Sequence, residues 1–444
     1  MDRDPTSDVS HFPDASASRR RGVYGVLRDT TFRSLRHRNY RLYFSGQIVS
    51  FVGSWMQASA LMWLMFDRTG DPRWPSWLLV AQVGPTVLLG TWGGQLADRL
   101  NKTKLIFATQ SAFLIHAILL TTLVAANLAD AWVILTLQIL SGVVQGVDLP
   151  ARLSLVPELV PREDLVNAVG LNSLLFNSAR AVGPGVAALV FATLELSKSL
   201  LPEGTDLVRL GAAVCFGLNS ISFVAVLFAL HAIHCPTTRS PSEGDAQRSQ
   251  WDGVRYLVKH PSMGGLVLLT LVICIFGWPV ITLMPAYTRD VLGRAEQSYY
   301  ALFIGLGIGA LVAALTTATF VSVERRKGFL LAGAVTTGLG LFCMALTANL
   351  PVAILCTGST GFGLILYLST GQSTLQLLVP DEMRGRVMAL WAMTLSASAP
   401  LGHLLAGHMT TVYGVVVVLF TMAVGVGLAA SGLAVLLLRQ QLRK

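Results

Sequence analysis

Three charged side chains lie inside long apolar stretches of this 444-residue chain: Asp148, Arg152 and Arg180. An ionised group within a membrane helix costs at least about 2.5–3.5 kcal/mol, so such residues usually pair with one another or line a pathway. Asp148 and Arg152 are four positions apart, which lets them pair along one helix, and Pro150 loosens the backbone between them. The pair is either a structural brace or a site that couples ion movement to other work. The residues leave both interpretations open.

Polar side chains recur at helical spacing within the same kind of apolar stretch. In the first stretch, four of them follow one another at intervals of three, four and three residues, from Gln47 to Gln57, so they share one helix face. Similar stripes mark the fourth and fifth stretches. The full set is Gln47, Ser50, Ser54, Gln57, Gln138, Ser141, Gln145, Ser173 and Asn177. Interhelical hydrogen bonds, worth about 0.6 kcal/mol each, could explain single polar residues. Three aligned stripes favour a water-filled cavity.

The elements that position these residues are predicted to be membrane helices. The chain is 53% hydrophobic and 13% charged, about half the charged fraction of an ordinary soluble domain. A net charge of +9 would suggest nucleic-acid binding on a soluble basic face, but the Lys and Arg residues lie in short loops between apolar stretches. The five cysteines have no metal-ligand spacing. We therefore predict a polytopic membrane protein without a nucleic-acid partner, a metal or a cofactor.

Twelve apolar runs are long enough to span a bilayer, which takes about 20 helical residues. They form two sets of six on either side of a polar segment, and the seventh run, 264–287, is expected as one helix. The predicted fold is an all-α membrane protein with twelve transmembrane helices in two pseudo-symmetric six-helix bundles. The predicted parts are an amino-terminal tail (1–38), a first bundle (39–233), a linker that ends in an amphipathic piece (234–260), a second bundle (261–438) and a carboxy-terminal tail (439–444).

The distribution of positive charge predicts the orientation. Most of the 33 Lys and Arg residues fall in the tails and in loops on one side of the predicted membrane. Because positively charged loops remain in the cytoplasm, both tails and the linker are predicted to be cytoplasmic. Residues 1–38 contain no apolar segment followed by a cleavage site and therefore do not look like a signal peptide. We expect a multi-pass protein in the cytoplasmic (inner) membrane of a bacterium.

The two halves also repeat at an interval of 219 residues, which relates Gly142 to Gly361 and Gly183 to Gly402. Parallel six-helix repeats are an architecture of transporters that bind their substrate between the halves. At the same interval, Asp148, Arg152 and Arg180 correspond to neutral residues, namely Tyr367, Gly371 and Ala399. The repeated fold therefore does not itself require these charges, which favours a functional role for them.

A short segment between the second and third runs, residues 93–104, resembles the signature of the major facilitator superfamily at the same place. Asn101 replaces the last glycine of that signature. We expect the turn to persist, because Asn tolerates the left-handed backbone conformation. The resemblance implies alternating access with a cytoplasmic gate, in which the Asp98 carboxylate meets the amino end of the eleventh helix near residues 385–387. The implied gate residues are Gly94, Asp98, Arg99, Lys102, Gly385 and Arg386.

Four further segments, 38–43, 148–161, 256–261 and 380–387, look like the branch of bacterial exporters that includes enterobactin and macrolide efflux proteins. The Gly183-Pro184 kink resembles a motif of superfamily antiporters. These resemblances imply a substrate cavity to which the second bundle also contributes. Its expected residues there are Trp278, Thr282, Ser369, Gln372, Ser396 and His403.

We therefore predict a secondary active transporter, a proton-coupled exporter of small amphipathic molecules of the drug or siderophore type. The chain has no phosphate-binding G-x-x-x-x-G-K-[ST] loop, so an ion gradient is the expected energy source. The expected partners are a small-molecule substrate, protons and the lipid bilayer, and the expected state is a monomer. The alternatives are a lipid or lysophospholipid transporter, suggested by the pattern in 156–167, and a membrane-embedded protein that does not transport. An enzyme is not expected, because no nucleophile–base pair lies at one membrane depth.

Overall fold

The computed structural model describes residues 32–233, 251–293, 296–321 and 325–442, and these residues form helices without strands. The first half contains η2 (Arg33–Arg36), α2 (Arg38–Thr69), α3 (Arg73–Arg99), α4 (Lys102–Ala125), α5 (Ala131–Leu159), η3 (Arg162–Asp164), α6 (Leu165–Leu196), η4 (Lys198–Leu200) and α7 (Leu207–His231). The second half contains α8 (Trp251–Lys259), α9 (Pro261–Gly277), α10 (Val280–Asp290), α11 (Glu296–Phe320), α12 (Arg326–Leu346), α13 (Leu350–Leu378), α14 (Asp381–Tyr413) and α15 (Val415–Leu442).

Eleven helical segments of the described chain are long and apolar enough to cross a membrane. One of them joins α9 to α10, so the predicted seventh helix exists but is interrupted at Trp278 and Pro279. The twelfth span is α3, which has 27 residues but lower hydropathy because of residues such as Gln82 and Thr86. The predicted all-α membrane fold of twelve transmembrane helices in two six-helix bundles is therefore confirmed.

Glycines explain how each bundle repeats the same packing. In the first bundle α3 packs on α5, and a Cβ added at Gly142 would lie 2.3 Å from the carbonyl oxygen of Gln82. In the second bundle α11 packs on α13, and a Cβ added at Gly361 would lie 2.2 Å from the carbonyl oxygen of Leu306. The repeat relates Gly142 to Gly361, so the same pair of spans approaches closely in both halves for the same reason.

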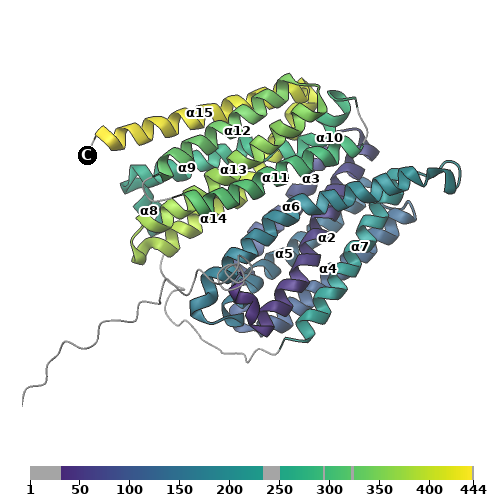
Figure 1. The fold of residues 1–444 in the computed structure, drawn as a ribbon, viewed down its shortest axis with the longest axis horizontal. Coiled ribbons are helices and arrows are strands. Elements are labelled where there is room, and N and C mark those ends of the chain that lie inside the picture. The colour runs from purple at the N-terminus through teal and green to yellow at the C-terminus, as the bar shows by residue number, and fades with distance from the viewer. Residues whose placement is uncertain (1–31, 234–250, 294–295, 322–324, 443–444) are drawn as a thin grey trace, which may run out of the picture.

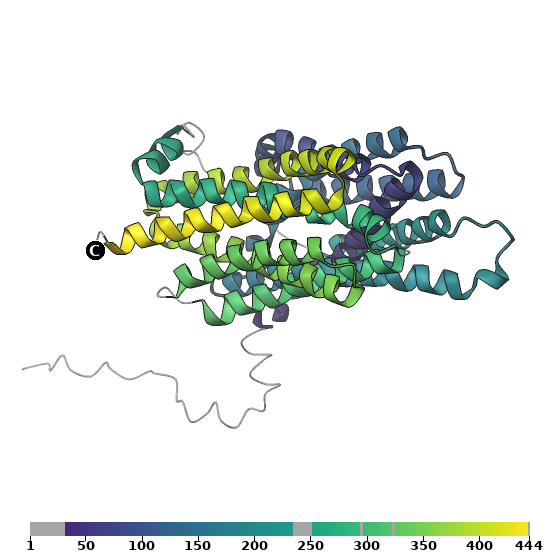
Figure 2. The same ribbon diagram turned by 90° about the horizontal axis from the view of Figure 1, so that it is seen from above.

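The two bundles lie side by side and are joined by two helix pairs (Figures 1 and 2). The pairs are α6 with α11 and α3 with α14. At one contact a Cβ on Gly307 would lie 2.5 Å from Cα of Ala181, and at the other a Cβ on Gly407 would lie 2.3 Å from Oγ of Ser76. Both contacts therefore depend on the absence of a side chain from one partner.

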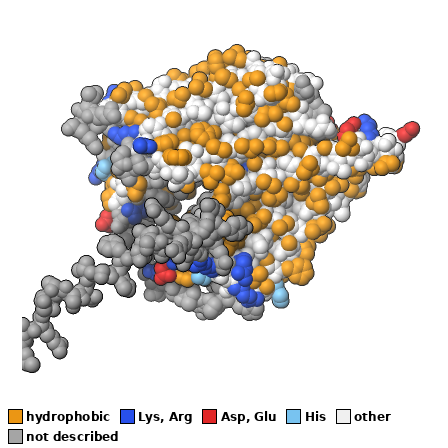
Figure 3. Space-filling view, viewed as in Figure 1, with side chains coloured by type: hydrophobic (Ala, Val, Ile, Leu, Met, Phe, Trp, Pro, Cys, Tyr) orange, Lys and Arg blue, Asp and Glu red, His pale blue; other side chains and the backbone are white. Residues whose placement is uncertain are grey.

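The long helices define two ends of the molecule. We call them the Gly70 end, where α2 turns into α3, and the Asp98 end, where α3 turns into α4. Figure 3 shows hydrophobic side chains over the long face between these ends, whereas charged side chains gather toward the ends. This pattern is that of a protein that exposes its middle to hydrocarbon and its ends to water.

Two short elements cover the Asp98 end. Helix η2 packs against the start of α6, where Oγ of Ser34 donates to the carbonyl oxygen of Asp164 at 3.0 Å and Arg33 pairs with the Asp164 carboxylate at 2.6 Å. The amphipathic piece predicted after the linker is α8, which packs on α14 and α9. Most of the predicted tail (1–31) and of the linker (234–250), and the last two residues, lie outside the described residues.

The α3–α4 connection is tighter than predicted and uses Asn101 differently. Only Leu100 and Asn101 separate the two helices. Asn101 has φ −64° and is the N-cap of α4, where its side chain accepts a hydrogen bond from the amide of Lys104. The expectation of a left-handed Asn101 was wrong, because an N-cap needs an extended backbone and a side-chain acceptor rather than a positive φ.

Candidate functional site

Asp148 lies at the centre of a polar network inside the first bundle. Its side chain is fully buried. Oδ1 accepts hydrogen bonds from Oγ1 of Thr109 at 2.6 Å and from Nε2 of Gln110 at 2.9 Å, and Oδ2 forms an ion pair with Arg152. Nη1 of Arg152 donates to Oε1 of Gln47 at 2.8 Å. The network thus connects α2, α4 and α5 through one carboxylate.

A polar cavity adjoins this network among α2, α3, α4, α5 and α7. Its volume is about 80 Å³. A water molecule in the liquid occupies about 30 Å³, whereas pockets for drug-sized ligands measure about 300–1,000 Å³. The space is therefore suited to a few waters. The predicted residues that line it are Ser50, Ser54, Gln57, Gln138, Ser141, Gln145 and Arg152.

Several residues of this cavity were not selected from the sequence. They come from helices without a polar stripe, and they are Gln82, Phe113, His116, Asn219 and Phe223. Nδ2 of Asn219 donates to Oε1 of Gln57 at 2.9 Å, which joins α7 to the stripe of α2. The sequence indicated them only weakly, since neither His116 nor Asn219 belongs to a polar stripe at helical spacing. Both reach the cavity because α4 and α7 pack beside α2 and α5.

Arg180 lies in a different place, between the two bundles. Its side chain is 6% exposed, and its guanidinium carbon lies 5.0, 5.1 and 5.5 Å from the ring centroids of Trp278, Trp55 and Phe176. Among the described residues, Nε and Nη1 have no hydrogen-bond acceptor, and no carboxylate forms an ion pair with the guanidinium. Cation–π contacts contribute about 0.5–2 kcal/mol, whereas each unsatisfied buried donor costs about 1–3 kcal/mol. The rings therefore do not replace an anion.

The other predicted residues of the fifth span face away from the polar cavity. Ser173 and Asn177 bond to their own helix, with Oγ of Ser173 donating to Val169 O and Nδ2 of Asn177 donating to Ser173 O. Ser173 also lines a groove of about 690 Å³ between α6 and α11 at the Asp98 end, together with Leu174 and Leu315. The fifth-helix stripe therefore belongs to the space between the bundles.

The second bundle contributes a smaller polar contact. Oγ1 of Thr282 and Nδ1 of His403 lie 3.2 Å apart, and both side chains are buried. Ser369 is half-buried, whereas Gln372 and Ser396 are exposed. Within the described residues these last three make no side-chain hydrogen bond. The structure therefore joins Thr282 to His403 and places Trp278 beside Arg180, but it builds no second polar network from the predicted set.

The positions related to the charged residues by the repeat are neutral, and two of them, Tyr367 and Gly371, are tightly packed. The hydroxyl of Tyr367 lies 3.0 Å from Oγ1 of Thr270. A Cβ on Gly371 would lie 2.8 Å from the ring of Trp391, so this ring occupies the space of a side chain. The second bundle therefore repeats the helices of the first without repeating its ion pair.

The predicted gate residues at the Asp98 end are not assembled in this conformation. Asp98 and Arg99 are exposed, and nothing lies within 4 Å of a Cβ added at Gly94 or Gly385. The other two gate residues form ion pairs within their own halves of the chain. Lys102 pairs with Glu158, and Arg386 pairs with Asp252 of α8. Among the described residues, no hydrogen bond or ion pair joins the bundles at this end.

The expected partner of Asp98 on α14 also needs correction. Helix α14 begins at Asp381, so the amides of residues 385–387 lie in its second turn. Only the first four amides of a helix lack a partner within it. Amides 385–387 are therefore not free donors for a carboxylate. Proline is most common at the first helical position, whereas Pro380 is the N-cap, so the proline alone did not locate the start of the helix.

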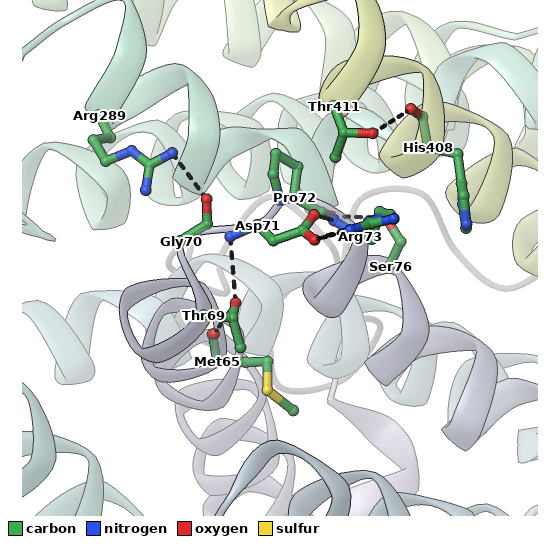
Figure 4. A network of polar contacts seen from close by, with 10 residues as sticks. All are labelled: Met65, Thr69, Gly70, Asp71, Pro72, Arg73, Ser76, Arg289, His408 and Thr411. Carbon is green, nitrogen blue, oxygen red and sulfur yellow. Dashed lines mark hydrogen bonds and ion pairs between the residues drawn. The ribbon is translucent and has the colours of Figure 1, made fainter.

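The Gly70 end, in contrast, is closed by contacts between the bundles (Figure 4). Nη2 of Arg289 in α10 donates to the carbonyl oxygen of Gly70 at 3.1 Å, at the carboxy end of α2. A cation there also complements the helix dipole. The hydroxyl of Tyr299 donates to Ser59 O at 3.1 Å, and Gly407 lies against Ser76. These contacts hold the first and second bundles together at this end.

Asp71 stabilises the turn that follows Gly70, whose carbonyl oxygen Arg289 binds. Burial opposes ionisation of Asp71, but hydrogen bonds from the side chain and amide of Arg73, and the charge of Arg73, outweigh it and lower the pKa of Asp71 below 3.8. Since the pKa is lowered in the folded protein, the stabilisation is complete above 3.8 and is lost as the pH falls through the lower folded value. The turn is therefore insensitive to pH near neutrality.

We expect Arg289→Gln to loosen the Gly70 end. The change removes a charged donor from the Gly70 carbonyl and, because the site is exposed, should cost about 1 kcal/mol, or about a fivefold shift toward separated bundles. Spin labels at Leu128 and Ala348, exposed residues of opposite bundles at this end, would report the separation. Lys198→Gln is the control, since Lys198 is exposed, pairs with Glu195 of its own bundle and takes no part in the turn at Gly70. Equal distance distributions in Arg289→Gln and the unaltered protein would contradict the assignment.

Two pseudo-symmetric six-helix bundles, closed at one end and enclosing polar groups at membrane depth, define the class of polytopic membrane transporters. Residues 29–444 match the family described as transmembrane secretion effectors. The chain belongs to this family, which is a branch of the major facilitator superfamily.

Relatives from three bacteria agree with this assignment at low identity. The chain is 23% identical to the staphyloferrin A transporter of Staphylococcus aureus, over 85% of this chain and 90% of the relative. It is 22% identical to macrolide efflux protein A of Streptococcus pyogenes, over 86% and 92%. It is 24% identical to the enterobactin exporter of Escherichia coli, over 92% and 93%.

Solved structures give the same fold. A bacterial homologue of the human lysosomal transporter Spinster, in an inward-facing conformation, superposes with a TM-score of 0.67 at 14% identity, over 90% of this chain and 97% of that chain. The nucleoside transporter NupG gives a TM-score of 0.67 at 14% identity, over 90% of this chain and 99% of that chain. At these identities the likeness establishes the fold alone.

Proposed function

We propose that this protein is a proton-coupled secondary transporter that exports small amphipathic molecules by alternating access. The description of the family as secretion effectors supports the direction, as do relatives named for macrolide efflux and enterobactin export. Molecules of the drug or siderophore type are the proposed substrates. The proposal places the monomer in the cytoplasmic membrane with both termini, and therefore the Asp98 end, in the cytoplasm.

The main support for the proposal is the buried Asp148 carboxylate, whose network adjoins a polar cavity large enough for a few waters. A fully buried acid that is bonded to Thr109, Gln110 and Arg152 can be neutralised by a proton, and the adjoining cavity offers a route for it. Protonation would remove the charge that pairs with Arg152 and would leave Gln47 of α2 as the remaining partner of its guanidinium. A proton would thereby change the contact between two helices of the first bundle.

Alternating access needs two sets of closing contacts that do not form together. In this conformation Arg289, Tyr299 and Gly407 join the bundles at the Gly70 end, and the gate residues at the Asp98 end are apart. A substrate would therefore enter from the cytoplasm. Release to the other side would require the Gly70-end contacts to break and the Asp98 end to close, with Asp98 as a proposed member of that closure.

We expect cells that express the protein to lose a preloaded amphipathic dye faster than control cells do. Ethidium, Nile red and carboxyfluorescein cover cationic, neutral and anionic substrates. A protonophore should stop the accelerated loss, whereas removal of sodium at a constant proton gradient should not. Loss that persists after the proton gradient collapses would contradict proton coupling. Faster uptake without faster loss would contradict export.

The groove between α6 and α11 favours lipid movement as a second candidate. It measures about 690 Å³ and combines apolar residues such as Val166 and Leu315 with Arg33 and Glu163 at the Asp98 end. An acyl chain and a charged headgroup need this combination. Proteoliposomes containing a fluorescent lysophospholipid would separate the candidates. Movement of the lysophospholipid without movement of any of the three dyes would favour the lipid candidate.

A further inference from the structure

Arg180 is a buried cation for which the described part of the chain supplies no anion. It is 94% shielded from solvent, and two of its three guanidinium nitrogens, Nε and Nη1, have no acceptor. Arg152, a half-buried arginine of the first bundle, differs in that it binds both Asp148 and Gln47. A buried cation within a membrane helix is costly unless it is paired, so the guanidinium of Arg180 should bind an anion that the described chain does not supply.

The surroundings of Arg180 restrict what the anion can carry. The rings of Trp55, Phe176 and Trp278 lie around the guanidinium, and the rings of Trp55 and Phe176 meet edge to face at 6.0 Å. Indole and phenyl faces bind planar or apolar groups well and carry no second charge. The site therefore fits an anionic group attached to an apolar, preferably aromatic, body.

Helix α6 relates Arg180 to the groove between the bundles. Ser173 lines the groove between α6 and α11, and Arg180 follows it after seven residues, about 10 Å along the same helix face. Phe176, between them, is 39% exposed. One residue beyond Arg180, Ala181 packs directly against Gly307 of the second bundle. Arg180 thus lies on the helix face that lines the groove, further along α6 than the last residue of its lining, Leu174.

We propose that Arg180 binds the anionic group of a small, soluble amphipathic substrate, held between Trp55 of the first bundle and Trp278 of the second. This inference rests on the proposed transport function and names the charge class of its substrate. Because Trp278 belongs to the second bundle, the bound anion contacts both bundles at once, and its affinity must differ between conformations in which Trp278 is near Arg180 or apart from it.

The experiment measures equilibrium binding to the purified full-length protein in detergent. The probes are naphthoate, naphthalenemethanol and naphthalenemethylamine, which share one ring system and carry a negative, zero or positive charge. We expect naphthoate to bind at least about tenfold more tightly than the alcohol, because charge-assisted hydrogen bonds to a buried guanidinium are strong. Equal affinity for all three probes, or a preference for the amine, would overturn the proposal.

Variants assign the preference to this side chain. Arg180→Gln should reduce naphthoate binding to the level of the alcohol, Arg180→Lys should retain part of the preference, and Trp278→Ala should weaken both naphthoate and alcohol. Arg209→Gln, a half-buried arginine of α7, is the matched control and should change nothing. Without ligand, Arg180→Gln should unfold at an equal or higher temperature than the parent, because it removes an unpaired buried charge. A lower temperature would identify Arg180 as a structural brace and overturn the proposal.

A final arm separates a soluble anion from a lipid. Phosphatidylglycerol in mixed micelles should compete weakly with naphthoate. If only the lipid binds in an Arg180-dependent manner, the proposed substrate class is wrong. The result is independent of the export assay, since binding in detergent needs no gradient or direction. Arg180-dependent naphthoate binding without dye export would support the anion site and overturn the transport proposal. Dye export without an Arg180-dependent charge preference would support the transport proposal and overturn the anion site.

Discussion

Replacing Asp148 with asparagine is expected to abolish proton-coupled transport while substrate binding persists. Asparagine keeps an acceptor for Thr109 and Gln110 but cannot exchange a proton. Transport in proteoliposomes with an imposed proton gradient should fall to the level of empty liposomes, and binding in detergent should be unchanged. Asp164→Asn is the control, because Asp164 is also a buried acid with an arginine partner but lies at the Asp98 end.

A double-mutant comparison separates this role from a structural one. Arg152→Gln alone leaves a buried uncompensated carboxylate and should destabilise the protein by about 3–5 kcal/mol. Replacing both Asp148 and Arg152 with neutral polar residues should recover much of that stability. Under the coupling hypothesis the double variant still lacks proton-driven transport. If the double variant transports like the parent, Asp148 and Arg152 only brace each other.

A single methyl group at Gly307 is expected to push α6 and α11 apart near their midpoints and thereby to separate the bundles. A Cβ there would lie 2.5 Å from Cα of Ala181, and backbone cannot rotate away as a flexible side chain can. Overpacking of this kind costs about 1–3 kcal/mol, which is about a 5- to 150-fold shift toward conformations with separated bundles. The distance between labels at Leu128 and Ala348 should therefore broaden and lengthen.

The matched control for Gly307→Ala is Gly427→Ala. A Cβ at Gly427 meets nothing within 4 Å, so this change adds the same atom to a membrane helix without a contact. It should leave the label distance unchanged and raise stability slightly, because alanine is the better helix former. Equal label distances in Gly307→Ala and Gly427→Ala would show that the α6–α11 contact does not hold the bundles together.

The fold could be predicted because membrane helices are encoded locally. Apolar length, loop charge and the 219-residue repeat need no knowledge of tertiary contacts, and the two-bundle prediction from them is confirmed. The interruption at Trp278 and Pro279 was missed because hydropathy averages over a window, and a single proline changes it little. The two-residue connection at Asn101 was missed because the charged segment around it reads as loop, whereas Arg99 and Lys102 are helical.

The site was less accessible to prediction because its contacts join distant residues. The spacing of Asp148 and Arg152 allowed a pair, and the pair is present. No polar stripe indicated that Thr109 and Gln110 bind Asp148, because only the packing of α4 on α5 brings them to its carboxylate. For the same reason, no sequence pattern indicated that Trp55 and Trp278, from opposite halves, both contact Arg180.

The neutral packing of Tyr367 and Gly371 has a consequence for membrane voltage. At membrane depth the first bundle carries Asp148, Arg152 and Arg180, whereas the related positions of the second carry no charge. An electric potential exerts about 2.3 kcal/mol per elementary charge per 100 mV on charge that crosses the whole membrane. Voltage therefore acts on these positions in one bundle only, and protonation of Asp148 raises the net charge of the three residues from one to two. We therefore expect a membrane potential to act on the charged residues of the first bundle and to leave the related positions of the second bundle unaffected.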